Sequence, residues 1–297
     1  MMQHQVVCFG EMLWDVLPSG AKPGGAPMNV AYHLQKLGMQ PAVISRVGQD
    51  EKGNELLRLL EKNGIPTTYV QQDATQPTGV VLARLNEKAE AHYEIMQPVA
   101  WDFIGAHEDL KKLVSGARYL VFGSLAARNP ISKNTLLQLL EGAGTKVFDI
   151  NLRAPHYTKE TLEQLLQKCD LLKINEEELE LVAGWYGHLK KLEDQMVLLQ
   201  ERFGIGTVVT TRGNAGAVLR IGDNTYAHPG YTVAVNDTVG SGDAFLAALL
   251  SQIHTGAEGT EALRFANGLG AFVASSEGAC PQYDIRDVRE RINTGFL

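Results

Sequence analysis

Short apolar runs rich in β-branched residues alternate along the chain with segments that have the periodicity of amphipathic helices. Strands are predicted for the apolar runs at residues 6–9, 42–48, 119–125, 146–152, 171–175 and 207–211. Helices are predicted between them, at residues 27–38, 50–64, 129–144 and 175–184. Asp50 is suited to begin the second of these helices and Gly64 to end it. The alternation predicts an α/β fold in which helices flank both faces of a parallel sheet.

Residues 66–98 depart from this alternation, because they contain three short strand candidates and no convincing helix. Residues 80–85 and 92–96, with the turn-like segment 86–91 between them, predict a β-hairpin. We interpret the whole segment as a small β-sheet inserted into the α/β domain. An ordinary hairpin at the edge of the main sheet fits the same pattern equally well.

The composition indicates a globular protein, with 44% hydrophobic and 21% charged residues in a chain of 297. A net charge of −7 argues against nucleic acid or an anionic membrane as the main partner. No basic leader and no run of about 18 apolar residues occurs, so neither a signal peptide nor a membrane span is expected. We therefore expect a cytoplasmic protein with three reduced cysteines. The eight histidines lack the spacing of zinc ligands.

Residues 236–253 combine a glycine-containing turn with the apolar stripe of a helix. Gly240, Ser241 and Gly242 precede a helix that is predicted from Ala244. Two glycines allow the backbone to approach a ligand closely, and amides at a helix N-terminus favour an anion. A phosphoryl group in transfer fits such a cradle, because its transition state spreads negative charge over several oxygens.

Asp243 directly follows this cradle, where it can accept the proton of a hydroxyl that attacks the phosphate. The plainer interpretation is that Asp243 favours the helix dipole from the first turn and that the glycines form a tight turn. The chain contains no GxxxxGK[ST] motif, which excludes a Walker-type site. It also lacks a complete GxGxxG after a strand, which argues against a Rossmann oxidoreductase.

A second group of polar residues follows the first predicted strand. Asp15 lies just beyond that strand, and Gly24 and Gly25 precede a helix that carries Asn29. A carboxylate accepts hydrogen bonds and an amide both donates and accepts them, which suits a ligand rich in hydroxyl groups. Taken separately, Asp15 is equally well explained as a turn residue and the glycine pair as a flexible entry to the helix.

Together, these stretches resemble both signature regions of the ribokinase-like (PfkB-type) carbohydrate kinases. Gly24–Ala31 is similar to the first signature and Asp237–Asp243 to the second. Asn175–Glu178 resembles the N-x-x-E element of the family, Thr211–Gly216 its T-x-G-x-x-G element and Gly278–Pro281 its closing G-A-x-P. The resemblance covers essentially the whole chain.

The resemblance implies a ribokinase-like fold in one domain over residues 1–297, with a β-sheet lid formed by about 11–18 and 66–98. Sugar-binding residues are implied at Asp15, Gly24, Gly25 and Asn29. Catalysis is implied for Asp243 as general base and for the amides of Gly240, Ser241 and Gly242. Packing of two lids against each other in a homodimer is also predicted, because a small two-faced sheet with open edges is poorly stable alone.

The family likeness also implies ATP with Mg²⁺ as the phosphate donor. Nucleotide contacts are implied at Asn175, Thr211, Gly213, Gly216 and Asn267. Glu178 is implied to act on the magnesium through water. A loop for a monovalent cation such as K⁺ is implied at Asp237 and at the carbonyls of Val239, Val273, Ser276 and Gly278.

The subfamilies most similar in sequence are the fructokinases and the 2-keto-3-deoxygluconate kinases. Arg153 lies past the strand predicted at 146–152, where it can reach the ligand of either. The predicted lid strand offers Tyr93 but no arginine, and Glu94 would repel a sugar carboxylate if it faced inward, whereas Arg84 on the neighbouring strand would compensate. We therefore expect ATP-dependent phosphorylation of fructose. The alternatives are the keto-deoxy acid, another sugar or a nucleoside; a non-catalytic sugar-binding protein would lack the intact Asp243 and its cradle.

Overall fold

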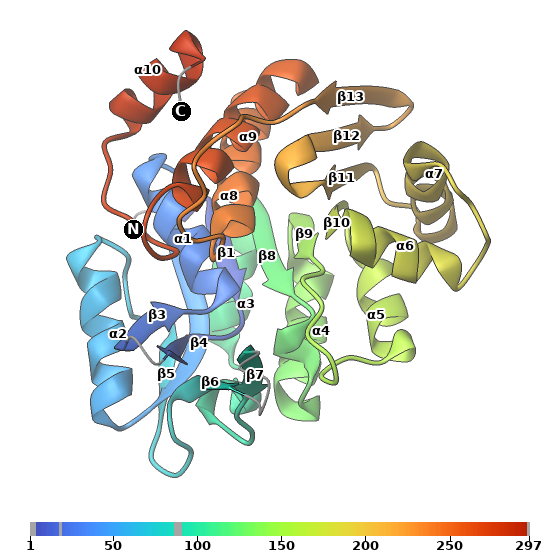
Figure 1. Cartoon of the computed structure of the whole chain (residues 1–297). Helices are drawn as coiled ribbons and strands as arrows, with labels where there is room; N and C mark the ends of the chain where they lie inside the picture. The colour runs from blue at the N-terminus through green and yellow to red at the C-terminus, as the bar shows by residue number, and fades with distance from the viewer. Residues whose placement is uncertain (1–3, 18–19, 86–90, 296–297) are drawn as a thin grey trace.

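The computed structural model describes residues 4–17, 20–85 and 91–295, and shows a large sheet and a small sheet (Figure 1). The large sheet contains nine strands of the described chain, which are parallel except where β11, β12 and β13 pair. Their spatial order is β13 (Asn224–His228), β12 (Ala217–Ile221), β11 (Thr207–Thr211), β10 (Leu171–Asn175), β9 (Thr145–Asp149), β8 (Tyr119–Gly123), β1 (Val6–Phe9), β4 (Pro41–Gly48) and β5 (Val70–Asp73).

Side chains alternate between the two faces of this sheet, so that each face builds its own hydrophobic core. In β1, Val7 and Phe9 join one buried cluster, and Val6 and Cys8 join the other. The first face is covered by α3 (Glu108–Gly116), α4 (Pro130–Gly142), α5 (Lys159–Leu166), α6 (Glu176–Gly184) and α7 (Leu192–Phe203). The second is covered by α1 (Ala26–Lys36), α2 (Glu51–Lys62), α8 (Ser241–His254) and α9 (Gly259–Ala274), with α10 (Ile285–Thr294) packed beyond α9.

The small sheet consists, within the described residues, of β3 (Gly20–Gly24), β2 (Leu13–Leu17), β6 (Gly79–Leu85) and β7 (Ala91–Ile95), in that order. The hairpin predicted over 80–96 is present as β6 and β7, and its turn at 86–90 lies outside the described residues. β3 was not predicted, because its glycines and proline give no strand pattern. The prediction that all of 66–98 belongs to the small sheet is wrong for β5, which pairs with β4 at the edge of the large sheet.

Several other boundaries differ from those predicted, and two of these differences lie at the site. The strand expected over 146–152 ends at Asp149, because Asn151 adopts a positive φ of 38° that turns the chain. The helix expected from Ala244 begins at Ser241, with Gly240 as its N-cap. The predicted N-cap of α2 is confirmed, since the Asp50 carboxylate accepts a hydrogen bond of 2.8 Å from the Gly53 amide. No described helix combines the length and the apolar character needed to cross a membrane.

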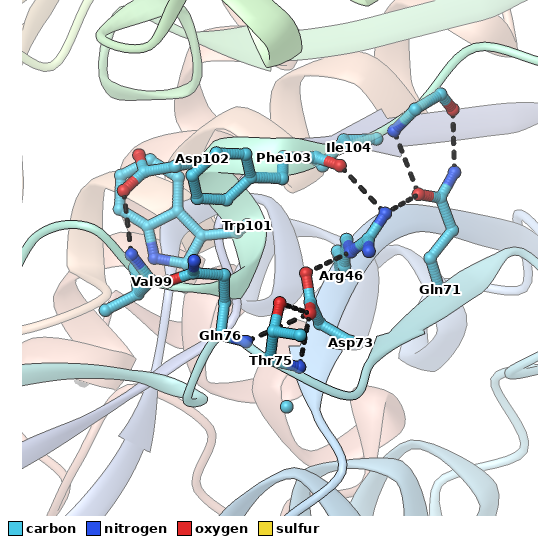
Figure 2. A network of polar contacts seen from close by, with 12 residues as sticks. Arg46, Gln71, Asp73, Thr75, Gln76, Val99, Trp101, Asp102, Phe103 and Ile104 are labelled. Atoms are coloured by element: carbon cyan, nitrogen blue, oxygen red, sulfur yellow. Dashed lines mark hydrogen bonds and ion pairs between the residues drawn. The ribbon is translucent and has the colours of Figure 1, made fainter.

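A polar network joins the edge of the large sheet to the segment that follows β7 (Figure 2). Arg46 on β4 donates to Asp73 at 2.8 Å and to the Phe103 carbonyl at 3.1 Å. The other Asp73 oxygen accepts from the amides of Thr75 and Gln76, at 2.8 and 2.9 Å. These contacts fix the chain between β5 and the small sheet.

A second anchor lies next to this network, around the buried Asp102. The guanidinium of Arg128 contacts both carboxylate oxygens of Asp102, at 2.6 and 2.8 Å. It also donates to the carbonyl of Met96, directly after β7, at 2.7 Å. Arg128 stacks over the ring of Trp101 with its central carbon 3.8 Å from the ring centre. The end of β7 is therefore held to the α/β body by a buried ion pair.

We predict that Asp73→Asn lowers the free energy of unfolding at neutral pH by about 1.5–3 kcal/mol, the range for hydrogen bonds to a charged group. Burial raises the pKa of Asp73, but the amides of Gln76 and Thr75, with Arg46, outweigh it and lower the pKa to about 2. The contribution is therefore present above the unfolded pKa of about 4 and is lost as the pH falls through the folded value. Urea unfolding of both proteins at several pH values measures it.

The matched control is Asp284→Asn, which alters a carboxylate that caps an exposed helix end and whose pKa is also lowered to about 2 by Arg286. This variant is expected to lose less stability, because water screens the pair. A difference between native and Asp73→Asn protein that stays constant down to acidic pH would contradict the prediction.

Candidate active site

The predicted anion cradle is the first turn of α8. Gly240 caps this helix with a φ of 77°, and a Cβ at this position would lie 2.5 Å from the Cβ of Ala279. Ser241, Gly242 and Asp243 form the first turn, where amides lack carbonyl partners within the helix. The Ser241 amide makes a long bond of 3.3 Å to the Thr238 carbonyl. The turn therefore presents backbone amides at a positive helix end.

Asp243 is buried beside this turn and meets the N-terminal motif. The amide nitrogen of Asn29 on α1 donates to an Asp243 carboxylate oxygen at 2.8 Å. Burial, followed by the nearby Asp149, raises the pKa of Asp243 to about 6. The positive charges of Lys173 and Arg153 act in the opposite direction. A carboxylate with a pKa near neutrality and a fixed orientation is suited to general base catalysis.

The sugar-side residues predicted from the sequence also converge. Asp15 on β2 pairs with Lys22 in the middle of β3, and a Cβ at Gly24 would collide with the Asp15 carboxylate. Gly25 adopts a φ of 111°, and a Cβ there would collide with the backbone carbonyl of Glu11. Both glycines therefore allow close approach of the strand to the helix entry. Burial raises the pKa of Asp15, and the charge of Arg153 opposes this shift.

The structure describes the side chain of Arg153 but only the backbone of Tyr93. Arg153 lies in the turn after β9, and its positive charge partly offsets the raised pKa values of Glu11, Asp15 and Asp243. Its position depends on this turn, which begins three residues earlier than the end of the predicted strand at 152. Tyr93 lies on β7 opposite Ala83 on β6, and its side chain lies outside the part of the chain that is described.

The residues predicted to contact a nucleotide lie partly at the carboxyl ends of β10 and β11. Asn175 ends β10 and Thr211 ends β11, and their backbones pair in register. Gly213 and Gly216 follow in a short turn with positive φ. Asn267 lies instead on α9, where its amide donates to the Leu263 carbonyl at 2.8 Å.

Glu178 has a structural task besides the one predicted for it. Its carboxylate accepts from the amides of Asn175 at 3.0 Å and Leu152 at 2.7 Å, while Asn175 accepts from the Glu178 amide at 2.8 Å. This capping box fixes the start of α6 and the turn after β9. Each carboxylate oxygen thus accepts one backbone amide, and the action of Glu178 on magnesium stays a prediction.

The loop predicted to hold a monovalent cation lies against the C-terminal end of α9. The amides of Asn236 and Asp237 both donate to the Ala274 carbonyl, at 2.9 and 3.2 Å. Within the described residues, no group of three or more His, Cys, Asp or Glu side chains is arranged to hold a metal ion. The candidate ligands at this loop are backbone carbonyls with a single carboxylate, and their role stays a prediction.

Four further residues of the site were not identified from the sequence. Lys22 on β3 approaches Asp237 at 3.7 Å and Glu277 at 3.3 Å. Glu11 is buried beyond β1, and burial raises its pKa to about 7. Lys173 and Asp149 form a buried ion pair at the ends of β10 and β9. Lys173 and Glu11 could have been identified from the sequence, because each is a charged residue inside or directly after an apolar run, in LLKIN and VVCFGE.

A mainly parallel sheet, with backbone amides at a helix N-terminus beside a buried carboxylate, is suited to phosphoryl transfer. Residues 4–286 match the model of the pfkB family of carbohydrate kinases, and the chain belongs to this family. It is therefore a carbohydrate kinase, and the predicted ribokinase-like fold is confirmed.

Similar proteins include the fructokinase of Escherichia coli, which is 30% identical over 94% of this chain and 95% of that protein. Among solved structures, the chain resembles a fructokinase from Vibrio cholerae O395 with bound fructose, ADP and calcium ion. That structure has a TM-score of 0.79, with 26% identity over 94% of this chain and 95% of the other. A similar match is an uncharacterized sugar kinase from Pyrococcus horikoshii in complex with ATP. Its TM-score is 0.82, with 26% identity over 98% and 100% of the two chains.

The close approach of Gly240 to Ala279 predicts that Gly240→Ala is damaging. Gly256 has nearly the same φ, 76°, but its Cβ position is open, so Gly256→Ala measures the backbone strain alone. We expect that control to cost about 1–2 kcal/mol of unfolding free energy and to retain kinase activity. Gly240→Ala is expected to cost more and to lose most activity, because the methyl group displaces Ala279. Urea unfolding and a kinase assay compare them; equal losses in both variants would contradict the prediction.

Proposed function

We propose that the chain transfers the γ-phosphate of ATP to a terminal hydroxyl group of fructose. The observation that carries the proposal is the 2.8 Å hydrogen bond between Asn29 and Asp243, which joins the sugar-side motif to the carboxylate beside the anion cradle. The likeness to fructokinases over nearly the whole chain, including one with bound fructose and ADP, supports the choice of substrates.

In the proposed reaction, Asp243 accepts the proton of the sugar hydroxyl as its oxygen bonds to the γ-phosphorus. The bond from that phosphorus to the bridging oxygen breaks, and ADP leaves. Backbone amides of Gly240, Ser241 and Gly242 stabilise the negative charge that the phosphoryl oxygens carry in the transition state. The position of the cradle at the N-terminus of α8 supports this role.

The sugar would be held by Asp15, Gly25 and Asn29, with Gly24, Tyr93 and Arg153 nearby. The small sheet that carries Asp15 would act as the lid, and its closure would exclude water from the phosphoryl group and limit hydrolysis of ATP. Pairing of two such sheets in a homodimer stays a prediction from the open edges at β3 and β7.

ATP would lie along Asn175, Thr211, Gly213 and Gly216, and Asn267 would approach it from α9. Mg²⁺ bound with the nucleotide neutralises phosphate charge. Glu178 would act on this ion through water, with its carboxylate oriented by the two backbone amides that it accepts. A K⁺-type cation would be held by Asp237 and the carbonyls of Val239, Val273, Ser276 and Gly278, next to Gly240.

Loss of the Asp243 carboxylate as general base is expected to remove turnover and to leave the binding of fructose and ATP largely intact. We predict that Asp243→Asn lowers kcat by about 10²–10⁴-fold, while the dissociation constants of fructose and ATP change little, because the amide keeps the shape of the carboxylate. In the native enzyme, kcat/KM should fall as the pH drops through about 6, the pKa of Asp243. Steady-state kinetics and calorimetry measure both effects.

Two controls accompany this experiment. Asp223→Asn changes a fully exposed carboxylate near β13 and should retain native kinetics. Glu11→Gln shows which acid sets the acidic limb of the pH profile, because the pKa of Glu11 is raised by burial to about 7. Near-native kcat in Asp243→Asn would remove this residue from the mechanism.

Fructose is expected to be the better substrate than 2-keto-3-deoxygluconate. The charge of Arg153 near Asp15 would suit a sugar carboxylate, but Asp15 and Glu11 would repel it. A coupled assay that compares kcat/KM for fructose, the keto-deoxy acid, other sugars and a nucleoside tests this directly. A higher value for the keto-deoxy acid would overturn the choice of fructose and leave the carbohydrate kinase assignment unchanged.

A further inference from the structure

A buried lysine lies at the centre of the site, and none of the reaction steps above uses it. Lys173 is the third residue of β10 and has only 8% of its surface exposed. Its ammonium nitrogen contacts both carboxylate oxygens of Asp149, the last residue of the neighbouring β9, at 2.8 Å each. Lysine is rarely buried to this degree, and then only when it is paired. The presence of a buried charged pair at this place therefore calls for a functional or structural reason.

The ammonium group lies directly against the anion cradle. A Cβ on Gly242 would be 3.3 Å from the nitrogen of Lys173, which leaves little space for any side chain between the cradle and the lysine. A positive charge at this distance, in a largely water-free environment, acts strongly on an anion held by the Gly242 amide. Lys173 therefore packs against the same turn that would hold the phosphoryl group.

Lys173 also faces more than one carboxylate. Burial alone lowers its pKa, but attraction to Asp149, and then to Asp243 and Glu178, reverses this effect and raises it. The groups that act on Asp243 come from several elements, and they are Asp149, Lys173, Arg153, Asn29, Glu11 and Cys280. Among those groups, Lys173 and Arg153 are positively charged, and Arg153 is exposed whereas Lys173 is buried.

A purely structural ion pair is the simplest alternative explanation. Buried ion pairs add little net stability, because the cost of removing two charges from water offsets their attraction. A structural pair could therefore be replaced by apolar side chains with little effect on chemistry. The position of the ammonium group against the Gly242 turn is not required by such a role.

We propose that Lys173 and Asp149 form a positioning pair for phosphoryl transfer, in which Asp149 fixes the Lys173 ammonium behind the cradle and the ammonium balances the charge of Asp243 and of the transferred group. The inference rests on the proposed function, because it assigns these residues to the same reaction. Lys173 is a positioning residue, since it acts through the Gly242 turn and through Asp243.

The two partners are expected to shift the pH profile in opposite directions. In Lys173→Met, Asp243 loses a stabilising positive charge, so the acidic limb of kcat/KM should move up by roughly one pH unit. In Asp149→Asn, a repelling carboxylate is lost and the ammonium is freed, so the limb should move down. A structural role alone would lower the melting temperature of both variants without opposite shifts.

A double variant keeps the test informative if a single variant fails to fold. Lys173→Met combined with Asp149→Leu removes both charges of the pair, so that neither partner is left buried and unpaired. The acidic limb should return close to its native position, while kcat stays at least about tenfold low because the charge behind the cradle is missing. Native kcat in the folded double variant would overturn the proposal.

The matched control is the partly exposed pair Lys146 and Asp170, which are 3.3 Å apart and link the opposite ends of the same two strands. Lys146→Met and Asp170→Asn should leave the pH profile unchanged. Titration of the Asp243 carboxyl group by ¹³C NMR in the unliganded protein separates this proposal from the proposed function, because it needs no turnover.

If no sugar is phosphorylated but the Asp243 titration midpoint shifts as expected in the variants, only the proposed substrate is wrong. If the enzyme turns over but the midpoints of Lys173→Met and Asp149→Asn do not move in opposite directions, the positioning pair is wrong.

Discussion

Burial of charge at the carboxyl ends of the central strands is the constraint on which the site depends. Glu11 follows β1, Asp149 ends β9 and Glu178 follows β10, so parallel strands bring their acids to one edge of the sheet. Asp243 approaches the same edge from α8. Each buried carboxylate needs donors or a cation, and the chain supplies backbone amides to Glu178, an amide side chain to Asp243 and an ammonium to Asp149. Glu11 is the least compensated, with one amide contact and one oxygen without a partner among the described residues, and its pKa is raised furthest toward neutrality.

The segment after α9 fixes the cradle to the helix that carries Asn29. The Ala279 carbonyl accepts from a ring nitrogen of His33 at 2.9 Å, and the other ring nitrogen lies 2.8 Å from the Tyr283 hydroxyl. Burial lowers the pKa of His33 to about 4, so the ring is neutral and donates through one nitrogen and accepts through the other. Because Ala279 also packs against Gly240, one residue holds both α1 and the start of α8 in place. Motifs more than two hundred residues apart in the chain thus share a single support.

Features that depend on a short stretch of the sequence, such as single strands and the glycine turn, could be predicted from it. Apolar runs such as 207–211 coincide with observed strands, and the glycines at 240 and 242 indicated the cradle. The partners of buried charges could not be predicted, since the Lys173–Asp149 contact depends on which strands become neighbours and in which register. The same limit applies to β5, whose short polar strand is assigned to a sheet only by its pairing with β4. The end of β9 could not be predicted either. Asn151 adopts a positive φ although it is not a glycine, and this ends the strand where the side-chain pattern alone would have continued it.

The small sheet contacts both the sugar side and the phosphoryl side of the site, and these contacts limit how it can move. Asp15 and Lys22 are register partners on β2 and β3, and Lys22 reaches across to Asp237 and Glu277 beside the cradle. The other side of this sheet is anchored by Thr78, which donates to Asp50, and by the Arg128 contact to Met96. The anchors on the β6–β7 side are buried ion pairs or charged hydrogen bonds, whereas the Lys22 contacts are partly exposed and therefore weak. A hinge at the β6–β7 side with release at Lys22 would move Asp15 relative to Asp243, so that sugar position and access to the phosphoryl site change together.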